Sequence, residues 1–352
     1  MPSDRMLEYY YAMGQDAADR ESYEEAAAYY AKAAAMGAAE ASHELGVIGH
    51  RYETGLGVAK DESRAQEYYE KSAATGNGEA ALLLGKLYVK GIAGAPAEPR
   101  KAKKYFEQSA DAGDAEAAYL LGRLYDEGML GRVNPRRAFR FFLLSAERGC
   151  GAAMLMVGLF YAQGNCIPKD LSAAELWIRK GAAIETEDGR ATLRTFLSVA
   201  ATEYASGEAG CLDDTRAFSM AEEAEALGND EAFLLLGETY RNKNKQPGHE
   251  EKAFQCFLRA DKKNIPAARA ALGLCYESGL GTVPDIQKAV ACYQAAAQEG
   301  NAFAMARLGY AYGTGEGTKK NPALAMKWLI QAAMRGDEGA ILTLRDDYQY
   351  TI

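Results

Sequence analysis

The side chains that most often do chemistry in proteins are few and scattered in this sequence. Its three histidines, His43, His50 and His249, show neither the H-E-x-x-H spacing of a zinc protease nor a cysteine at ligand spacing. No G-x-S-x-G nucleophile motif occurs, nor a phosphate-binding G-x-x-x-x-G-K-[ST] loop. We therefore predict no catalytic residue, no metal site and no cofactor.

Three basic residues are the best candidates for binding a partner. His50, Lys86 and Arg123 each follow a glycine at the same place in a repeating pattern, and Tyr119 lies one helical turn before Arg123. We call the three basic residues the basic ladder. With Tyr119, the ladder could hold an acidic segment or a terminal carboxylate of a partner protein through charge-assisted hydrogen bonds.

The ladder lies inside an internal repeat of about 36 residues, which is the signature of a stacked-repeat fold. A tyrosine recurs at one position, a small residue stands three positions before it, and an alanine marks a third position in phase. The tyrosines are Tyr52, Tyr88, Tyr125, Tyr161, Tyr204, Tyr240, Tyr276 and Tyr312. The small residues are Gly49, Gly85, Gly122, Gly158, Ala201, Gly237, Gly273 and Gly309. The alanines are Ala65, Ala102, Ala138, Ala174, Ala217, Ala253, Ala289 and Ala325.

Each repeat has the pattern of two helices joined by a glycine-containing loop. The first carries A-x-x-x-L-G-x-x-Y and the second A-x-x-Ar-Ar-x-x-A-A, where Ar is usually aromatic, with apolar residues at helical spacing. Second helices should begin at capping aspartates and end at glycines: Asp61, Asp170, Asp213 and Asp285, then Gly76, Gly113, Gly149, Gly228, Gly300 and Gly336. We expect the glycine before each tyrosine to let the two helices approach closely, and the aromatic side chains to fill the seam between repeats.

The six cysteines form no C-x-x-C pair: they are Cys150, Cys166, Cys211, Cys256, Cys275 and Cys292. Cys256 and Cys292 fall at a repeat position that we interpret as a core column. Elsewhere that position holds Tyr68, Tyr105, Phe141, Trp177 and Trp328. We predict buried free thiols, which agree with a reducing compartment.

These motifs resemble the Sel-one-like repeat family, a relative of the tetratricopeptide repeats. The family pattern of L-G-x-x-Y, G-x-G-V-x-x-D, K/R-A-x-x-W/Y-Y/F and A-A-x-x-G is close to the stretch from Tyr276 to Asn301, and residues 49–78 and 309–337 match nearly as well. The resemblance covers roughly residues 6–337 and weakens in the repeats of Tyr204 and Tyr240. It implies an all-α, α/α superhelical solenoid whose first helices line a concave, partner-binding face.

We expect a single repeat domain over residues 1–352, with about nine helix–turn–helix repeats and a C-terminal capping helix. Residues 6–37 should form a first unit with tetratricopeptide spacing, residues 38–337 eight Sel-one-like repeats, and residues 338–352 the capping helix. The step from Tyr161 to Tyr204 is 43 residues long. It contains an acidic insertion near residues 184–190, which we interpret as a kink or register shift.

Charge and hydropathy exclude several classes of partner. The net charge of −9 and the pI near 5.2 oppose binding to nucleic acid or to an anionic membrane surface. No window is apolar enough to insert in a membrane, and the start lacks a secretory signal. We expect a cytoplasmic, monomeric protein, with export by a route that needs no signal left open. For the ladder, the alternative to binding is a solvated face on which acidic neighbours such as Glu53 or Asp126 pair with it.

The function that follows is a non-catalytic adaptor or scaffold that binds partner proteins on the concave face. One alternative is a hydrolase assembled across several repeats, because cysteine-rich secreted members of the family have been discussed as β-lactam binders or hydrolases. This chain lacks their paired cysteine in each repeat. The other alternative is an exported bacterial effector or envelope component.

Overall fold

The protein is described by a computed structural model that covers residues 2–184, 187–208, 210, 212–242 and 246–348. Over these residues the chain is all-α and forms 19 helices, which pair as nine helix–turn–helix repeats followed by one more helix. The predicted fold class is therefore confirmed. The chain divides into two compact units, residues 1–189 and 190–352, and each is considered by itself; the single-domain organisation stays a prediction.

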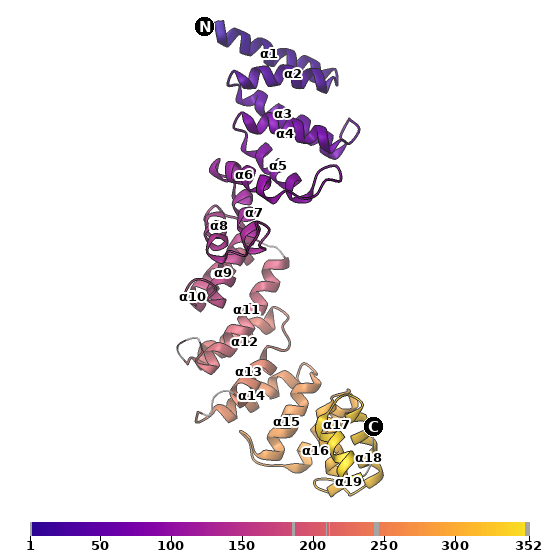
Figure 1. Ribbon diagram of the computed structural model, residues 1–352. Helices are drawn as coiled ribbons and strands as arrows, with labels where there is room; N and C mark the ends of the chain where they lie inside the picture. The colour runs from indigo at the N-terminus through magenta and orange to yellow at the C-terminus, as the bar shows by residue number, and fades with distance from the viewer. Residues whose placement is uncertain (1, 185–186, 209, 211, 243–245, 349–352) are drawn as a thin grey trace. The chain divides into compact units, whose positions relative to one another are not determined.

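In the first unit, the two helices of each repeat lie side by side and the next pair follows along the chain (Figure 1). The pairs are α1 (Pro2–Asp19) with α2 (Tyr23–Ala35), α3 (Ala39–Thr54) with α4 (Glu62–Ala74), α5 (Gly78–Lys90) with α6 (Pro99–Asp111), α7 (Ala115–Asp126) with α8 (Pro135–Glu147), and α9 (Gly151–Gln163) with α10 (Leu171–Ala182).

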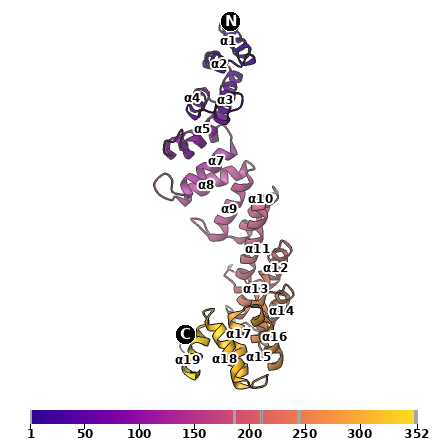
Figure 2. The same cartoon turned by 90° about the vertical axis from the view of Figure 1, so that its right-hand side faces the viewer.

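The second unit continues the same pattern, and α17 and α18 lie beside each other in both views (Figures 1 and 2). Its helices are α11 (Glu187–Ser206), which crosses the division between the units, α12 (Asp214–Ala226), α13 (Ala232–Asn242), α14 (His249–Asp261), α15 (Pro266–Ser278), α16 (Ile286–Gln298), α17 (Ala302–Thr314), α18 (Pro322–Ala333) and α19 (Glu338–Tyr348). None of the described helices is long and apolar enough to span a bilayer.

The closest contact within a pair joins the repeat glycine of the first helix to one large side chain of the second. A Cβ atom on Gly85 would stand 2.5 Å from the Phe106 ring, and one on Gly273 would stand 2.5 Å from the Tyr293 ring. These distances are shorter than any two packed carbon atoms tolerate, so only glycine allows the helices to pack this closely. The large residues at this position are Tyr69, Phe106, Phe142, Ile178, Phe257, Tyr293 and Leu329.

The residue that packs on the glycine is not the one predicted from the sequence: it is one position further along the second helix. The second residue of each aromatic pair faces the glycine and is buried, whereas the first is turned by one helical step of about 100° and lies nearer the surface. At that first position Tyr68 and Cys256 are buried, but the others are half-buried: Tyr105, Phe141, Trp177, Cys292 and Trp328. The cysteines of the described residues are free thiols, and Cys211 lies outside those residues.

The repeat that lacks the glycine has a small residue at both of these positions. Ala201 replaces glycine on α11, and the position that faces it on α12 holds Ala221 where the other repeats have a large residue. Both alanines are fully buried. A methyl group added on one side is therefore matched by a large side chain removed on the other, which is the volume compensation that a close-packed core requires.

Each tyrosine of the repeat joins its first helix to the start of the second. The Asp61 N–H donates to the Tyr52 carbonyl at 2.8 Å, and the same bond recurs in the repeats of Tyr88, Tyr125, Tyr161, Tyr204, Tyr276 and Tyr312. The Asp61 carboxylate then accepts a hydrogen bond from the Arg64 N–H and caps α4. The capping roles predicted for Asp61, Asp170, Asp213 and Asp285 are all confirmed, and Asn134 and Asn321 fill the same role in α8 and α18.

Glycines end the second helices as predicted, since all six adopt a positive φ between 87° and 103°. The prediction that the tyrosine rings fill the seam between repeats holds for some repeats, whereas Tyr52, Tyr88 and Tyr125 stack on an aromatic ring of their own repeat. Tyr276 lies 5.4 Å from Phe254 of the preceding repeat, measured between ring centroids, and Tyr161 lies 5.6 Å from Phe139.

The 43-residue step lengthens one helix. Residues 187–190 of the acidic insertion form the first turn of α11, which has 20 residues where α9 has 13; residues 185 and 186 lie outside the described residues. At the C-terminus α19 packs on α18 through its buried Ala340 and Leu344, at the place predicted for the capping helix. Residues 349–352 of that prediction also lie outside the described residues.

A double-mutant cycle on Gly273 and Tyr293 tests the glycine contact. We expect Gly273→Ala to destabilise the protein by roughly 1–3 kcal/mol because its methyl group overlaps the Tyr293 ring. Tyr293→Ala alone should cost about 3–5 kcal/mol, as for other large aromatic residues in cores. In the double variant the overlap is gone, so urea unfolding should show a loss at least ~1 kcal/mol smaller than the sum. Strict additivity would contradict direct contact.

Candidate partner-binding site

The basic ladder extends over three successive first helices of the first unit. His50 lies on α3, Lys86 on α5 and Arg123 on α7. Their side chains are 54%, 40% and 48% exposed. The structure therefore places one accessible basic group at the same position of three consecutive repeats. We call the exposed side of α3, α5 and α7 that carries them the first-helix face.

Every ladder residue lies beside a carboxylate. His50 Nδ1 is 3.7 Å from Glu53 Oε2, Lys86 Nζ is 2.7 Å from Glu116 Oε1, and Arg123 Nε is 2.7 Å from Glu127 Oε1. The pairing alternative drawn from the sequence is thus right about Glu53 and wrong about Asp126. Glu127 lies one helical turn beyond Arg123, which brings its carboxylate within reach of the guanidinium. Asp126 is partly buried, and burial together with the charge of Glu127 raises the pKa of its carboxyl group.

These ion pairs do not close the ladder to a partner. Exposed pairs of this kind contribute about 0–1 kcal/mol each because water screens them and holding two long side chains costs entropy. A carboxylate of a bound segment can therefore replace Glu116 or Glu127 at little cost.

Tyr119 is mainly a packing residue between α7 and α8. Its ring centroid lies 5.7 Å from that of Phe142, and the side chain is half-buried. Burial raises the pKa of its hydroxyl, and the nearby charge of Arg123 acts in the opposite direction. Tyr119 is therefore close to Arg123, as predicted, but its ring belongs to the edge of the core.

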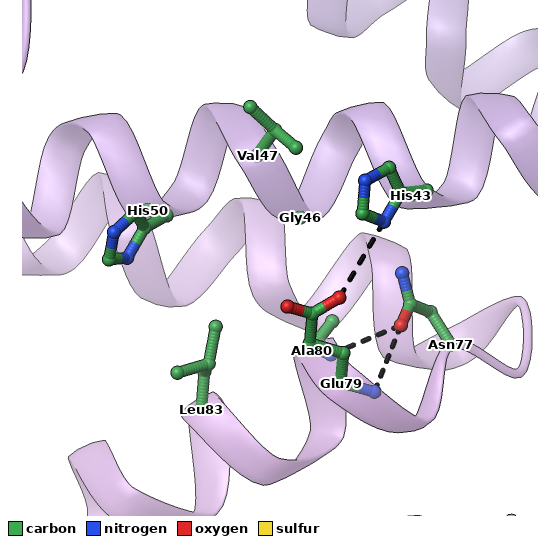
Figure 3. A pocket seen from close by; sticks show the side chains of 8 residues that line it. All are labelled: His43, Gly46, Val47, His50, Asn77, Glu79, Ala80 and Leu83. Atoms are coloured by element: carbon green, nitrogen blue, oxygen red, sulfur yellow. Dashed lines mark hydrogen bonds and ion pairs between the residues drawn. The ribbon is translucent and has the colours of Figure 1, made fainter.

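A pocket of about 200 Å³ lies at the His50 end of the first-helix face, between α3 and α5 (Figure 3). His43, Gly46, Val47 and His50 come from α3, and Asn77, Glu79, Ala80 and Leu83 come from the start of α5. His43 Nδ1 lies 3.6 Å from Glu79 Oε2, and the Asn77 side chain caps α5. Val47, Ala80 and Leu83 give the pocket an apolar wall, while the two imidazoles supply polar groups at its rim.

The pocket exists because one side chain is missing. Gly46 stands at the position where the next three repeats have Leu82, Tyr119 and Leu155. A Cβ atom on Gly46 would have its nearest neighbour at 3.4 Å, so this glycine is not required by close packing. Gly46 is not among the residues predicted from the sequence, although a glycine in a column of large residues is a signal of such a pocket.

Apolar side chains run beside the ladder. Val47, Leu83, Leu120 and Met156 occupy one repeat position on α3, α5, α7 and α9, and all four are half-buried. In the second unit the same position holds Val199 and Leu235, which are 50% and 44% exposed, then the buried Ala271, and Arg307, where the apolar row ends. Among the residues that the structure describes, no cluster of three or more His, Cys, Asp or Glu side chains could hold a metal ion. A row of apolar side chains beside a row of basic side chains suits the binding of a polypeptide.

Comparison with known proteins agrees with this architecture. The Sel1 repeat model matches residues 9–37, 39–77, 78–114, 115–150, 151–183, 266–301 and 302–337. The unmatched residues 184–265 include the two repeats in which the sequence pattern weakens. The match at residues 9–37 falls on the segment expected to have tetratricopeptide spacing.

The chain is similar to two solved structures. A Sel1 repeat protein from Oxalobacter formigenes is 25% identical, with 89% of this chain and 87% of that chain covered and a TM-score of 0.52. A protective antigen of uropathogenic Escherichia coli with an SLR fold is 23% identical, with 98% and 80% covered and a TM-score of 0.40. No curated protein matches the chain significantly.

Two alanine substitutions in α3 should have opposite effects on stability. Gly46→Ala meets only ordinary contacts, so we expect it to stabilise the protein by roughly 0.5–1 kcal/mol through helix propensity. Gly49→Ala would place its Cβ 2.8 Å from the Tyr69 ring, and we expect a net loss of roughly 1–3 kcal/mol. Urea unfolding of the two variants measures the difference. Equal effects would show that the two glycines do not have the separate roles assigned to them.

Proposed function

The chain belongs to the Sel1 repeat family, and on that premise we propose that it is a non-catalytic adaptor that holds an extended, acidic segment of a partner protein along its first-helix face. The Sel1 repeat architecture as a class serves protein–protein interaction. The observation that carries the proposal is the recurrence of one basic and one apolar side chain, side by side, on three consecutive first helices: His50 with Val47, Lys86 with Leu83, and Arg123 with Leu120.

The spacing of the repeats suggests how a partner would be read. Lys86 on α5 and Arg123 on α7 occupy the same position one repeat apart. Acidic residues of an extended partner segment, spaced to match this step, would meet Lys86 and Arg123 in turn, and the residues between them would lie on the apolar row.

The two kinds of contact would have different effects. Charge complementarity mainly sets the rate of association and the choice of partner, because each new ion pair replaces an existing one. The affinity would come from apolar burial along the row and from a side chain inserted in the pocket next to His50.

We further propose a monomer in a reducing compartment such as the cytoplasm. The free thiols Cys256 and Cys275, both buried, support the compartment, because such thiols persist where disulfides do not form. The packing of α19 on α18 through Ala340 and Leu344 supports the monomer, because it covers apolar surface of α18 within the same chain.

Reversing the ladder charges tests the adaptor function. We expect the double variant Lys86→Glu/Arg123→Glu to lose at least tenfold of the partner proteins captured from the native cell by the unchanged chain, as measured by quantitative mass spectrometry. Both side chains are exposed, so circular dichroism should show an unchanged helical spectrum.

The matched control is Lys71→Glu/Lys104→Glu, which makes the same change of charge at exposed positions on the second helices α4 and α6. This control should retain the captured proteins. If both double variants lose the same proteins, only net charge matters; if neither loses any, the ladder is a solvated surface. Either result would contradict the proposed binding face.

A further inference from the structure

A second pocket, of about 560 Å³, lies at the loop end of the repeats of Tyr88 and Tyr125, away from the ladder residues. It is formed by the first turns of α6 and α8, the end of α7 and the loop between α7 and α8. The lining residues are Arg100, Lys103, Tyr125, Leu130, Gly131, Arg132, Asn134 and Arg137. Four of them are basic and none is acidic, in a chain whose net charge is −9.

The positive charge of this pocket is largely uncompensated. Within the described part of the chain, Arg100, Arg132 and Arg137 form no ion pair with a carboxylate, unlike every residue of the basic ladder. Arg137 Nη1 donates to the Tyr125 hydroxyl at 3.3 Å, and its guanidinium lies 5.4 Å from the centre of the Tyr125 ring. Lys103 alone is paired, with Glu107 at 3.2 Å. The pocket therefore has an excess of about three positive charges.

Helix electrostatics add to this excess. The first turns of α6 and α8 contain no acidic residue, and Arg100 and Arg137 lie within them. Positive side chains at a helix N-terminus oppose the helix dipole, which favours negative charge there. Arg100 and Arg137 therefore each reduce the stability of their helix slightly, and both lie beside this pocket. Residues that lower stability in this way are typical of functional sites.

The hydrogen-bonding groups favour one kind of ligand. The guanidinium groups can only donate hydrogen bonds, and the Asn134 Oδ1 atom already accepts one from the Arg137 N–H at 3.1 Å. A ligand in this pocket must therefore be rich in acceptors and negatively charged. A phosphate monoester carries about 1.5 to 2 negative charges and three acceptor oxygens, so it matches three guanidinium groups better than a single carboxylate does.

We propose that this pocket binds a phosphate monoester, carried by a small phosphorylated molecule or by a phosphorylated side chain of a partner. A phosphodiester backbone fits less well, because it needs an extended basic surface and the rest of the chain is acidic. The site shares no residue with the basic ladder, so it stands or falls independently of the adaptor proposal.

Isothermal titration calorimetry in a phosphate-free buffer tests the site on the full chain. The probes are inorganic phosphate, glucose 6-phosphate, a phosphoserine hexapeptide, the same peptide with glutamate in place of phosphoserine, and a single-stranded RNA hexanucleotide. We expect saturable binding of at least one monoester, at least tenfold tighter than binding of the glutamate peptide or of the RNA. A preference for glucose 6-phosphate would identify a small molecule as the source, and a preference for the phosphopeptide would identify a partner protein.

Two double variants that remove the same amount of positive charge distinguish direct contact with the ligand from a general electrostatic effect. Arg100→Gln/Arg132→Gln removes two lining residues and should weaken monoester binding at least tenfold. Arg136→Gln/Arg140→Gln removes two exposed charges of α8 that do not line the pocket, and should weaken binding less than twofold. All four side chains are exposed, so both variants should fold. Absence of saturable monoester binding, equal losses in the two variants, or tighter binding of the RNA would overturn the proposal.

Discussion

One contact sets the geometry of this protein: a glycine of the first helix packed against a large side chain of the second. Seven repeats from Gly49 to Gly309 have it, and Gly14 against Tyr30 supplies it in the first pair. The contact sets how closely the two helices of a pair approach. The hydrogen bond from the capping residue to the tyrosine carbonyl, such as Asp61 to Tyr52, is a second and separate restraint, because it is also present in the repeat of Ala201 and Tyr204, which lacks the glycine.

Function follows from this register. If every first helix is held at the same rotation, then the same sequence positions are exposed in every repeat, and side chains far apart in the sequence form rows. Lys86 and Arg123 share a row for this reason. The α3 helix shows the two uses of glycine together, since Gly49 is needed for close packing, whereas Gly46, on another side of the helix, lines a pocket on the first-helix face.

The sequence predicted the repeats, the caps and the helix-ending glycines well, because each depends on local chemistry at a fixed spacing. It did not predict which of two adjacent residues faces the partner helix: Tyr105 lies in the predicted core column, but Phe106 is the residue that packs on the glycine. The exchange of Ala201 and Ala221 is visible only when two helices are placed in contact. The cationic pocket was missed because Arg100 and Arg132 are distant in sequence and meet only through the fold.

The repeat of Ala201 and Ala221 offers the most direct test of the central contact, because two substitutions can introduce there the glycine and the large side chain that the other repeats have. Ala221→Phe alone should overpack the pair of α11 and α12 and lower the free energy of unfolding by roughly 1–3 kcal/mol. Adding Ala201→Gly recreates the glycine and aromatic pair of the other repeats, and we predict that urea unfolding will then show at least ~1 kcal/mol of that loss recovered. If Ala201→Gly instead makes the Ala221→Phe protein less stable, the glycine contact does not govern the packing of the repeats.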